Sequence, residues 1–215
     1  MAQYIPTKRP KDMKEEQWLG AYLDKNVYPI IEAANHVRFQ RNSDTAKQLL
    51  GIDLVRTDSD GTETIIDEKA QLHYVWNHIS TCAFELRSVQ QGRLLGGWFY
   101  DPGALAQVYY YAVNIDVKAG VSKLTSPNDF AGCQILSIDR AALIAALAKM
   151  NITEDRCITF VNEHPGGKWY DLTDEGDIHI TASPKLNESP LNLVIERRTL
   201  LRLDPDNIKW IWNAP

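Results

Sequence analysis

Residues 51–71 read GIDLVRTDSDGTETIIDEKAQ, and this stretch has the pattern of two strands joined by a tight turn. Strand-forming residues dominate 51–55 and 63–70. Residues 59–61, Ser-Asp-Gly, are typical of a three-residue hairpin loop that ends with glycine in the left-handed region. If residues 58 and 62 close this loop, the register places Asp53 on the first strand opposite Asp67 on the second.

The predicted hairpin gathers charged side chains on one face of a sheet. Opposed side chains lie ~4.5–5.5 Å apart, and like charges at that separation are destabilising. Two acids so close call for a compensating cation, or for a proton on one of them. Because side chains alternate along a strand, Lys69 and Gln71 are expected on the face of Asp67. The stretch therefore predicts a site formed by Asp53, Asp67, Lys69 and Gln71.

These residue types suit metal-assisted hydrolysis of a phosphodiester. Mg²⁺ takes oxygen ligands, usually one or two carboxylates together with waters and substrate phosphate, and it would polarise the phosphoryl group. Lys69 could orient the attacking hydroxide or stabilise negative charge on the phosphate. In the alternative interpretation, Asp53 and Asp67 only edge a solvated hairpin. The apolar residues of both strands, such as Leu54 and Ile66, favour central strands instead.

The motif made by 51–53, the turn and 66–69 resembles the signature of the PD-(D/E)XK nuclease superfamily, which includes restriction endonucleases and repair nucleases. The resemblance covers at most about residues 14–140. It implies a core of a helix, three antiparallel strands, then a further helix and strand. It also implies that Asp53 is the lone motif aspartate, Asp67 the second metal ligand and Lys69 the catalytic lysine, with Gln71 where several members carry an extra polar residue.

The sequence departs from this signature in two ways. No proline stands beside Asp53, where Gly51 and Ile52 precede it. Glu68 occupies the variable position of the motif and is expected to point away from the site. It then needs its own partner on the other face, for which an arginine is the candidate, although the sequence does not say which.

Further candidates lie outside the hairpin. Glu32 lies late in the first predicted helix, where many members of the superfamily supply an acid to the metal site, and Glu85 alternates with apolar residues on a predicted third strand. Both are candidate metal ligands, and a solvated glutamate is the alternative for Glu32. The polar residues before the first strand are candidates for contacts with the phosphate backbone: Gln40, Arg41, Lys47 and Gln48.

The order of expected elements predicts an α+β or mixed α/β fold. An amphipathic helix over 12–34, which Pro29 kinks or divides, precedes three meandering strands at 51–55, 63–70 and 81–86. Strands at 109–115 and 134–138, a helix over 140–150, and strands at 178–181 and 191–195 follow. With the resemblance, this gives a restriction-endonuclease-like core whose central mixed sheet contains an antiparallel meander flanked by helices. One domain is expected over 1–215: a flexible arm at 1–11, the core at about 14–140 and a C-terminal elaboration at about 150–215.

Composition narrows the class of protein. Lysine and arginine number 23 against 28 acids, a net charge of −5, and hydrophobic residues make up 44%, as in ordinary globular domains. This composition excludes collagen-like and intrinsically disordered chains and argues against a nucleic-acid-coating protein. No apolar stretch approaches the ~20 residues of a membrane helix, and the N-terminus lacks a secretory pattern. Cys82, Cys133 and Cys157 form neither a disulfide framework nor a metal knuckle. A cytoplasmic protein is expected.

The sequence thus predicts a hydrolase: a Mg²⁺-dependent nuclease, with Mn²⁺ as a substitute ion, that cleaves phosphodiester bonds in DNA. A catalytically inactive member of the same fold is the alternative, a nucleic-acid- or protein-binding factor of a phage or mobile element. DNA is the expected partner, and no membrane partner is expected. A second copy of the chain is a further candidate, because many nucleases dimerise to cut two strands.

Overall fold

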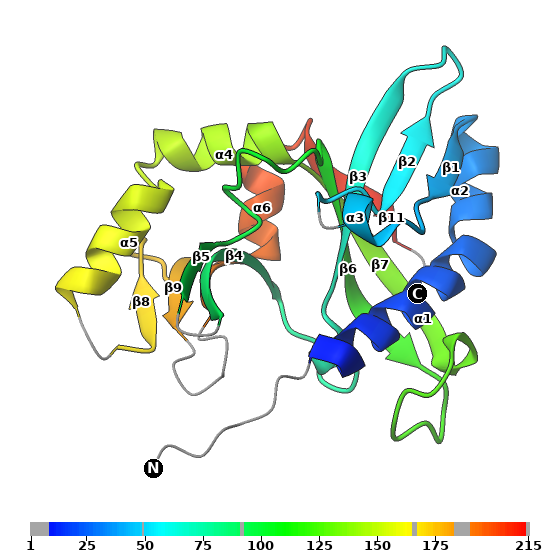
Figure 1. The fold of residues 1–215 in the computed structure, drawn as a ribbon, viewed down its shortest axis with the longest axis horizontal. Coiled ribbons are helices and arrows are strands. Elements are labelled where there is room, and N and C mark those ends of the chain that lie inside the picture. The colour runs from blue at the N-terminus through cyan, green and yellow to red at the C-terminus, as the bar shows by residue number, and fades with distance from the viewer. Residues whose placement is uncertain (1–8, 49, 91–92, 165–166, 183–189, 214–215) are drawn as a thin grey trace. The chain divides into compact units, whose positions relative to one another are not determined.

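The computed structural model describes residues 9–213 except 49, 91–92, 165–166 and 183–189 (Figure 1). The described residues form an α+β protein with six α-helices, one mixed sheet of six strands and one antiparallel sheet of five strands. Within the same residues, no helix has the length and apolar character needed to cross a membrane. Residues 1–8 of the predicted arm lie outside the described residues, and 9–11 begin the first helix.

The chain forms two compact units. Among the described residues, 9–79, 105–140 and 206–213 form the first unit, and 80–104 with 141–205 form the second. We call them the six-strand unit and the five-strand unit after their sheets. The segment expected as a C-terminal elaboration divides between them, since its last strand belongs to the six-strand unit. The count of one domain stays a prediction.

The six-strand unit contains the predicted hairpin. Its strands lie in the order β1-β2-β3-β6-β7-β11, in which β3 and β6 are parallel and all other neighbours are antiparallel. Its elements are α1 (Arg9–Asn26), α2 (Tyr28–Asn35), β1 (Arg38–Arg41), α3 (Thr45–Gln48), β2 (Leu54–Thr57), β3 (Glu63–Ala70), the 3₁₀ turns η1 (Leu72–Tyr74) and η2 (Pro127–Asp129), β6 (Val108–Val117), β7 (Phe130–Asp139) and β11 (Ile208–Trp212).

The long N-terminal helix divides where proline predicts it. α1 ends at Asn26 and α2 begins at Tyr28, so that Pro29 lies in the first turn of α2, where a missing N–H costs no helical hydrogen bond. His36 ends α2 in the left-handed conformation, at φ 55°. The prediction that Pro29 kinks or divides this helix is therefore confirmed.

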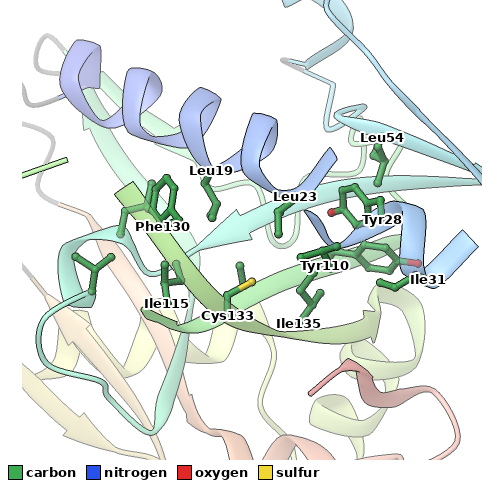
Figure 2. Packing of buried hydrophobic residues seen from close by; sticks show 14 of the residues in the cluster. Leu19, Leu23, Tyr28, Ile31, Leu54, Tyr110, Ile115, Phe130, Cys133 and Ile135 are labelled. Carbon is green, nitrogen blue, oxygen red and sulfur yellow. The ribbon is translucent and has the colours of Figure 1, made fainter. Parts of the chain in front are cut away.

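α1 and α2 cover one face of the six-strand sheet. Apolar side chains of the two helices, including Leu19, Leu23 and Ile31, pack with Leu54 of β2 and Ile66 of β3 in one buried cluster (Figure 2). Leu54 and Ile66 are fully buried. Because neighbouring residues on a strand point to opposite faces, residue 67 projects from the other face.

The predicted hairpin register is confirmed. Leu54 pairs with Ile66 and Thr57 with Glu63, while the Asp53 N–H donates to the carbonyl of residue 66 at 3.1 Å. Gly61 closes the loop at φ +86°, a conformation that glycine adopts without steric cost. The ladder ends at Leu54 and does not pair Asp53 with Asp67; the Asp53 N–H, which donates to the same carbonyl that Leu54 faces, shows that the chain leaves the regular register at Asp53.

The predicted meander is wrong at its third strand. The segment expected there forms β4 (Thr81–Gln90) in the five-strand sheet, and β3 pairs instead with β6 in parallel. Burial explains the choice. β6 is buried almost continuously from residue 109 to 113, as a strand covered on both faces requires, whereas buried and half-buried residues alternate along β4.

The five-strand unit has the order β5-β4-β10-β9-β8. The predicted helix over 140–150 is confirmed by α4 (Arg140–Lys149), and the predicted strands at 178–181 and 191–195 by β9 (Ile178–Ala182) and β10 (Leu191–Glu196). The remaining elements are β5 (Arg93–Gly96), α5 (Glu154–Glu163), β8 (Trp169–Asp171) and α6 (Arg197–Leu203). Alternate residues of β4, such as Phe84 and Leu86, are fully buried.

Shortening Ile66 tests how the helices cover β3. We expect Ile66→Ala to lower the free energy of unfolding by about 2–5 kcal/mol, because the substitution leaves a cavity in a fully buried cluster. Ile30→Ala, at an exposed position of α2, should change it by less than about 0.5 kcal/mol. Urea denaturation measures both, and equal effects would contradict the packing described here.

Candidate active site

A glycine lets the chain enter β2 beside Asp67. Gly51 has φ +75°, and a Cβ placed on it would lie 3.3 Å from the Cβ of Ala106 and 3.5 Å from Oδ2 of Asp67. A larger residue would therefore be strained in its backbone and crowded by its neighbours. The backbone therefore passes close to Asp67 at Gly51 and reaches Asp53 two residues later.

Asp53 and Asp67 form a closely coupled acid pair. Their side chains share a hydrogen bond, and Oδ2 of Asp53 also accepts the Glu68 N–H at 2.9 Å. Burial, followed by the negative charge of Asp67, raises the pKa of Asp53 from an ordinary 3.8 to about 7. Lys69 and the Glu68 N–H oppose this shift without cancelling it. Asp53 therefore keeps its proton to a higher pH than an isolated aspartate does.

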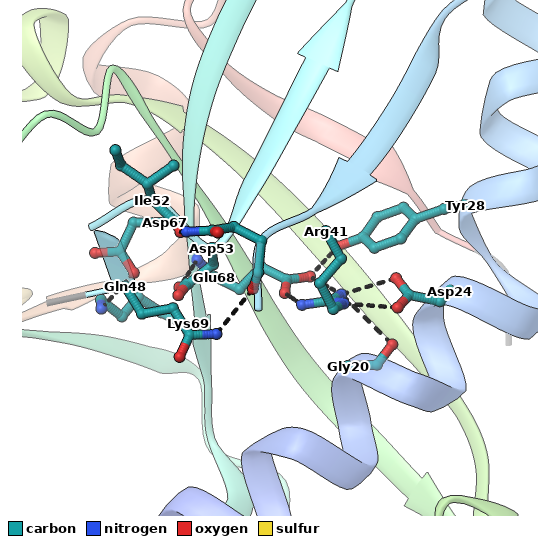
Figure 3. A network of polar contacts seen from close by, with 11 residues as sticks. Gly20, Asp24, Tyr28, Arg41, Gln48, Ile52, Asp53, Asp67, Glu68 and Lys69 are labelled. Carbon is teal, nitrogen blue, oxygen red and sulfur yellow. Dashed lines mark hydrogen bonds and ion pairs between the residues drawn. The ribbon is translucent and has the colours of Figure 1, made fainter. Parts of the chain in front are cut away.

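Lys69 completes the group on this face of β3. Its Nζ donates to Oδ1 of Asp67 at 2.6 Å (Figure 3). Burial works against the charged ammonium, but the carboxylates of Asp67 and Asp53 outweigh it and raise the pKa of Lys69, with a further contribution from Glu16 of α1. Two carboxylates thus share one lysine, which leaves an unbalanced negative charge when both are ionised.

The chemistry of this donor set fits a hard divalent ion. Carboxylate oxygens are the ligands that Mg²⁺ takes, and Mg²⁺ commonly uses one or two of them while keeping several waters. A divalent ion would also neutralise the negative charge that otherwise keeps a proton on Asp53. Among the described residues, no three or more His, Cys, Asp or Glu side chains gather as a metal-binding group. Asp53 and Asp67 are therefore the candidate side-chain ligands.

Glu68 points to the opposite, helix-covered face, as expected (Figure 3). Its carboxylate binds the guanidinium of Arg41 on β1 and accepts a hydrogen bond from the Tyr28 hydroxyl of α2. Arg41 also donates through Nε to Asp24 of α1 at 2.6 Å. The expected partner on this face is thus Arg41. Because its guanidinium is held by two carboxylates, the prediction that Arg41 contacts phosphate does not fit the structure.

The remaining predicted site residues lie on several elements. Gln71 directly follows the end of β3; it is buried, and its N–H donates to the Ala112 carbonyl at 3.2 Å, so its role in the site stays a prediction. Glu32 accepts the Phe39 N–H at 2.6 Å on the helix-covered side of the sheet. Glu85 lies on β4 in the five-strand sheet, so the expectation that it shares a sheet face with Asp67 is wrong.

Three further residues lie near the site, and no pattern in the sequence predicts them there. β6 places Tyr109 opposite Asp67 and Tyr111 opposite Lys69. The negative charge of Glu16 on α1 helps to raise the pKa of Lys69. The tyrosine run was a visible strand signal, but its pairing with β3 follows from a parallel connection that local patterns do not encode. The charge of Glu16 reaches Lys69 only because of how α1 packs.

Comparison with protein-family models, curated proteins and solved structures finds no match to this chain. The assignment of a function therefore depends on the geometry of the acid pair and Lys69.

Replacing Asp53 by asparagine tests the acid pair without metal. The folded pKa of about 7 lies above the ordinary 3.8, so the wild type loses stability as the pH rises from about 4 to about 7. We expect Asp53→Asn to raise the free energy of unfolding at pH 8 by on the order of 1 kcal/mol, and by less at pH 5, where Asp53 is already protonated. Thermal unfolding at the two pH values measures the difference.

Asp60→Asn in the hairpin loop is the matched control. Hydrogen bonds from Thr62 lower the pKa of Asp60, so its removal should not stabilise the protein at pH 8. A gain for Asp53→Asn that is equal at both pH values, or a loss at pH 8, would contradict the coupling between Asp53 and Asp67.

Proposed function

We propose that this protein is a Mg²⁺-dependent nuclease that hydrolyses phosphodiester bonds in DNA. One observation supports the proposal: two carboxylates, Asp53 and Asp67, are in direct contact, and Lys69 binds Asp67. Two carboxylates this close repel each other unless a proton or a cation lies between them, and a divalent ion would meet that need.

Each residue has a role in such a reaction. Asp53 and Asp67 would hold Mg²⁺, which supplies Lewis acidity to the scissile phosphoryl group. Asp53 would lose its proton when the metal binds, because metal ligands must be deprotonated. Lys69 would donate a hydrogen bond to the attacking water or to a phosphate oxygen, where negative charge builds in the transition state. The Glu68 N–H keeps Asp53 oriented toward its partner.

The order of elements supports a restriction-endonuclease-like core in its first half. α1 and α2 are followed by three antiparallel strands, β1, β2 and β3, with the short helix α3 between β1 and β2; Asp53 directly precedes the second strand and Asp67 lies on the third. The second half differs from what the resemblance implies. In the described part of the connection from β3 to β6 there is no α-helix, and two strands of the five-strand sheet stand in its place.

A specific observation also favours a second candidate function, a catalytically inactive binding protein on the same fold. The ammonium of Lys69 already lies 2.6 Å from Asp67, and two carboxylates are fewer protein ligands than a preformed metal cage would offer. In that case the acids and the lysine would only stabilise the hairpin.

A plasmid-nicking assay separates the two functions. With Mg²⁺ or Mn²⁺ we expect the wild type to nick supercoiled DNA, and Asp67→Ala and Lys69→Ala to lose at least about 100-fold in rate, because each removes a group that would act on the reacting phosphate or its metal. Glu63→Gln, at the exposed start of the same strand, should retain wild-type activity.

The outcomes assign the function. Cleavage that survives both Asp67→Ala and Lys69→Ala would reject this site. No cleavage with either metal, by wild-type protein that still binds DNA, would support the inactive binding protein. Cleavage of an RNA strand in place of the plasmid would retain the metal mechanism and overturn the assignment of DNA.

A further inference from the structure

Glu68 connects the two faces of β3. Its carboxylate is fixed on the helix-covered face, while its own N–H donates to Oδ2 of Asp53 on the other face at 2.9 Å. Asp67 and Lys69 are its direct neighbours in the chain. Glu68 thus contacts Asp53 through its backbone N–H, and it lies between Asp67 and Lys69 along the strand.

The contacts of the Glu68 carboxylate come from two elements, and a third element holds one of its partners. Arg41 of β1 binds it with two guanidinium nitrogens, and Tyr28 of α2 donates its hydroxyl. Arg41 is itself held by Asp24 of α1, at 2.6 Å and 2.9 Å, and donates to the carbonyl of Gly20 at 3.4 Å. The structure therefore ties β3 to β1 and to both helices at this residue.

The contacts of the Glu68 carboxylate are the more sheltered part of this network. The Glu68 side chain is 16% exposed, and Tyr28 is buried. Removing one partner of a sheltered ion pair destabilises the protein, because the remaining charge is then neither paired nor solvated by water. The side chain of Glu68 is therefore held in one place, and the peptide unit next to it has little freedom to turn.

That peptide unit carries the contact with Asp53. The bond between residues 67 and 68 is planar, so the Glu68 N–H can turn away from Asp53 only if the backbone rotates on either side of that bond, at Asp67 and at Glu68. Contacts that hold the Glu68 side chain limit this rotation and keep the N–H directed at Asp53.

We infer that Glu68, together with Arg41 and Tyr28, positions the acid pair and so sets its affinity for a divalent ion. None of the three side chains contacts Asp53 or Asp67; the effect passes through the Glu68 peptide. The part that concerns the metal rests on the proposed function, whereas the part that concerns the position of Asp53 does not. Glu68, Arg41 and Tyr28 are in this sense positioning residues.

The first test measures metal affinity in variants that keep the site intact. We expect Glu68→Gln to weaken Mn²⁺ binding about tenfold in calorimetric titrations, the scale of outer-sphere substitutions at metal sites. Tyr28→Phe should weaken it less, because it removes one hydroxyl. The double variant Arg41→Gln with Glu68→Gln should recover part of the loss, because two amides can bind each other without unbalanced charge.

Arg56→Gln is the matched control. It breaks another arginine–carboxylate pair of the same hairpin, in which Nε of Arg56 lies 3.0 Å from Asp58 at the loop end. We expect wild-type Mn²⁺ affinity in this variant, even where its thermal stability falls. An equal loss of Mn²⁺ affinity in Arg56→Gln and Glu68→Gln would show that any loosening of the hairpin weakens metal binding, and it would overturn the inference.

The second test needs no metal. Amide hydrogen exchange at residue 68 reports the N–H that Asp53 accepts, and we expect it to speed up at least tenfold in Glu68→Gln after correction for the intrinsic rates of the two residues. Tyr28→Phe should show a smaller increase and Arg56→Gln none. If Glu68→Gln does not fold, as circular dichroism would show, Tyr28→Phe supplies the same comparison.

The two tests fail in distinguishable ways. Wild-type protein that binds no Mn²⁺ would overturn the proposed function, and hydrogen exchange would still decide whether the network positions Asp53. Wild-type protein that binds Mn²⁺ as tightly as folded Glu68→Gln and Tyr28→Phe would overturn the inference and leave the metal site standing.

Discussion

The antiparallel pairing of β2 with β3 fixes which side chains of this protein can act together. A slip of one residue would turn Asp67 and Lys69 toward the helices and Glu68 toward the opposite face. The buried pair of Leu54 and Ile66 resists that slip, because it would replace two apolar side chains under α1 and α2 by charged ones. The core thus specifies the site: the apolar residues of the hairpin select the register, and the register brings the acids together.

Charge is distributed differently on the two faces of β3. On the helix-covered face, Arg41 binds the carboxylates of both Glu68 and Asp24, and Tyr28 also donates a hydrogen bond to Glu68. On the other face, Asp53 and Asp67 share one ammonium and retain a proton near neutral pH. The first arrangement stabilises a fold and the second costs stability. Groups that oppose folding in this way are typical of sites that serve a function, and this contrast is the physical basis for placing the chemistry at the acid pair.

The wider architecture shows where local patterns stop being informative. The run from Tyr109 to Val113 is a strong strand signal, and α4, β9 and β10 also follow from periodicity and composition. None of these signals says which strand lies beside β3. β6 takes that place because its continuous apolar run needs cover on both faces, whereas the alternating burial of β4 suits the five-strand sheet. Strand identity is a local property, but strand neighbours depend on the long connections between them.

The sequence by itself determined the hairpin, its register, the meeting of Asp53 with Asp67 and the direction of Glu68 away from Asp67 and Lys69, because turn chemistry and the two-residue period act over a few positions. Only the tertiary structure decided that Arg41 and Tyr28 meet Glu68, that Asp24 meets Arg41, that Glu32 and Glu85 lie on other surfaces, and that tyrosines of β6 stand beside Asp67 and Lys69. The contacts with Glu68, Arg41, Asp67 and Lys69 join residues 17 to 42 positions apart along the chain, and they depend on the packing of whole helices and sheets rather than on any local preference.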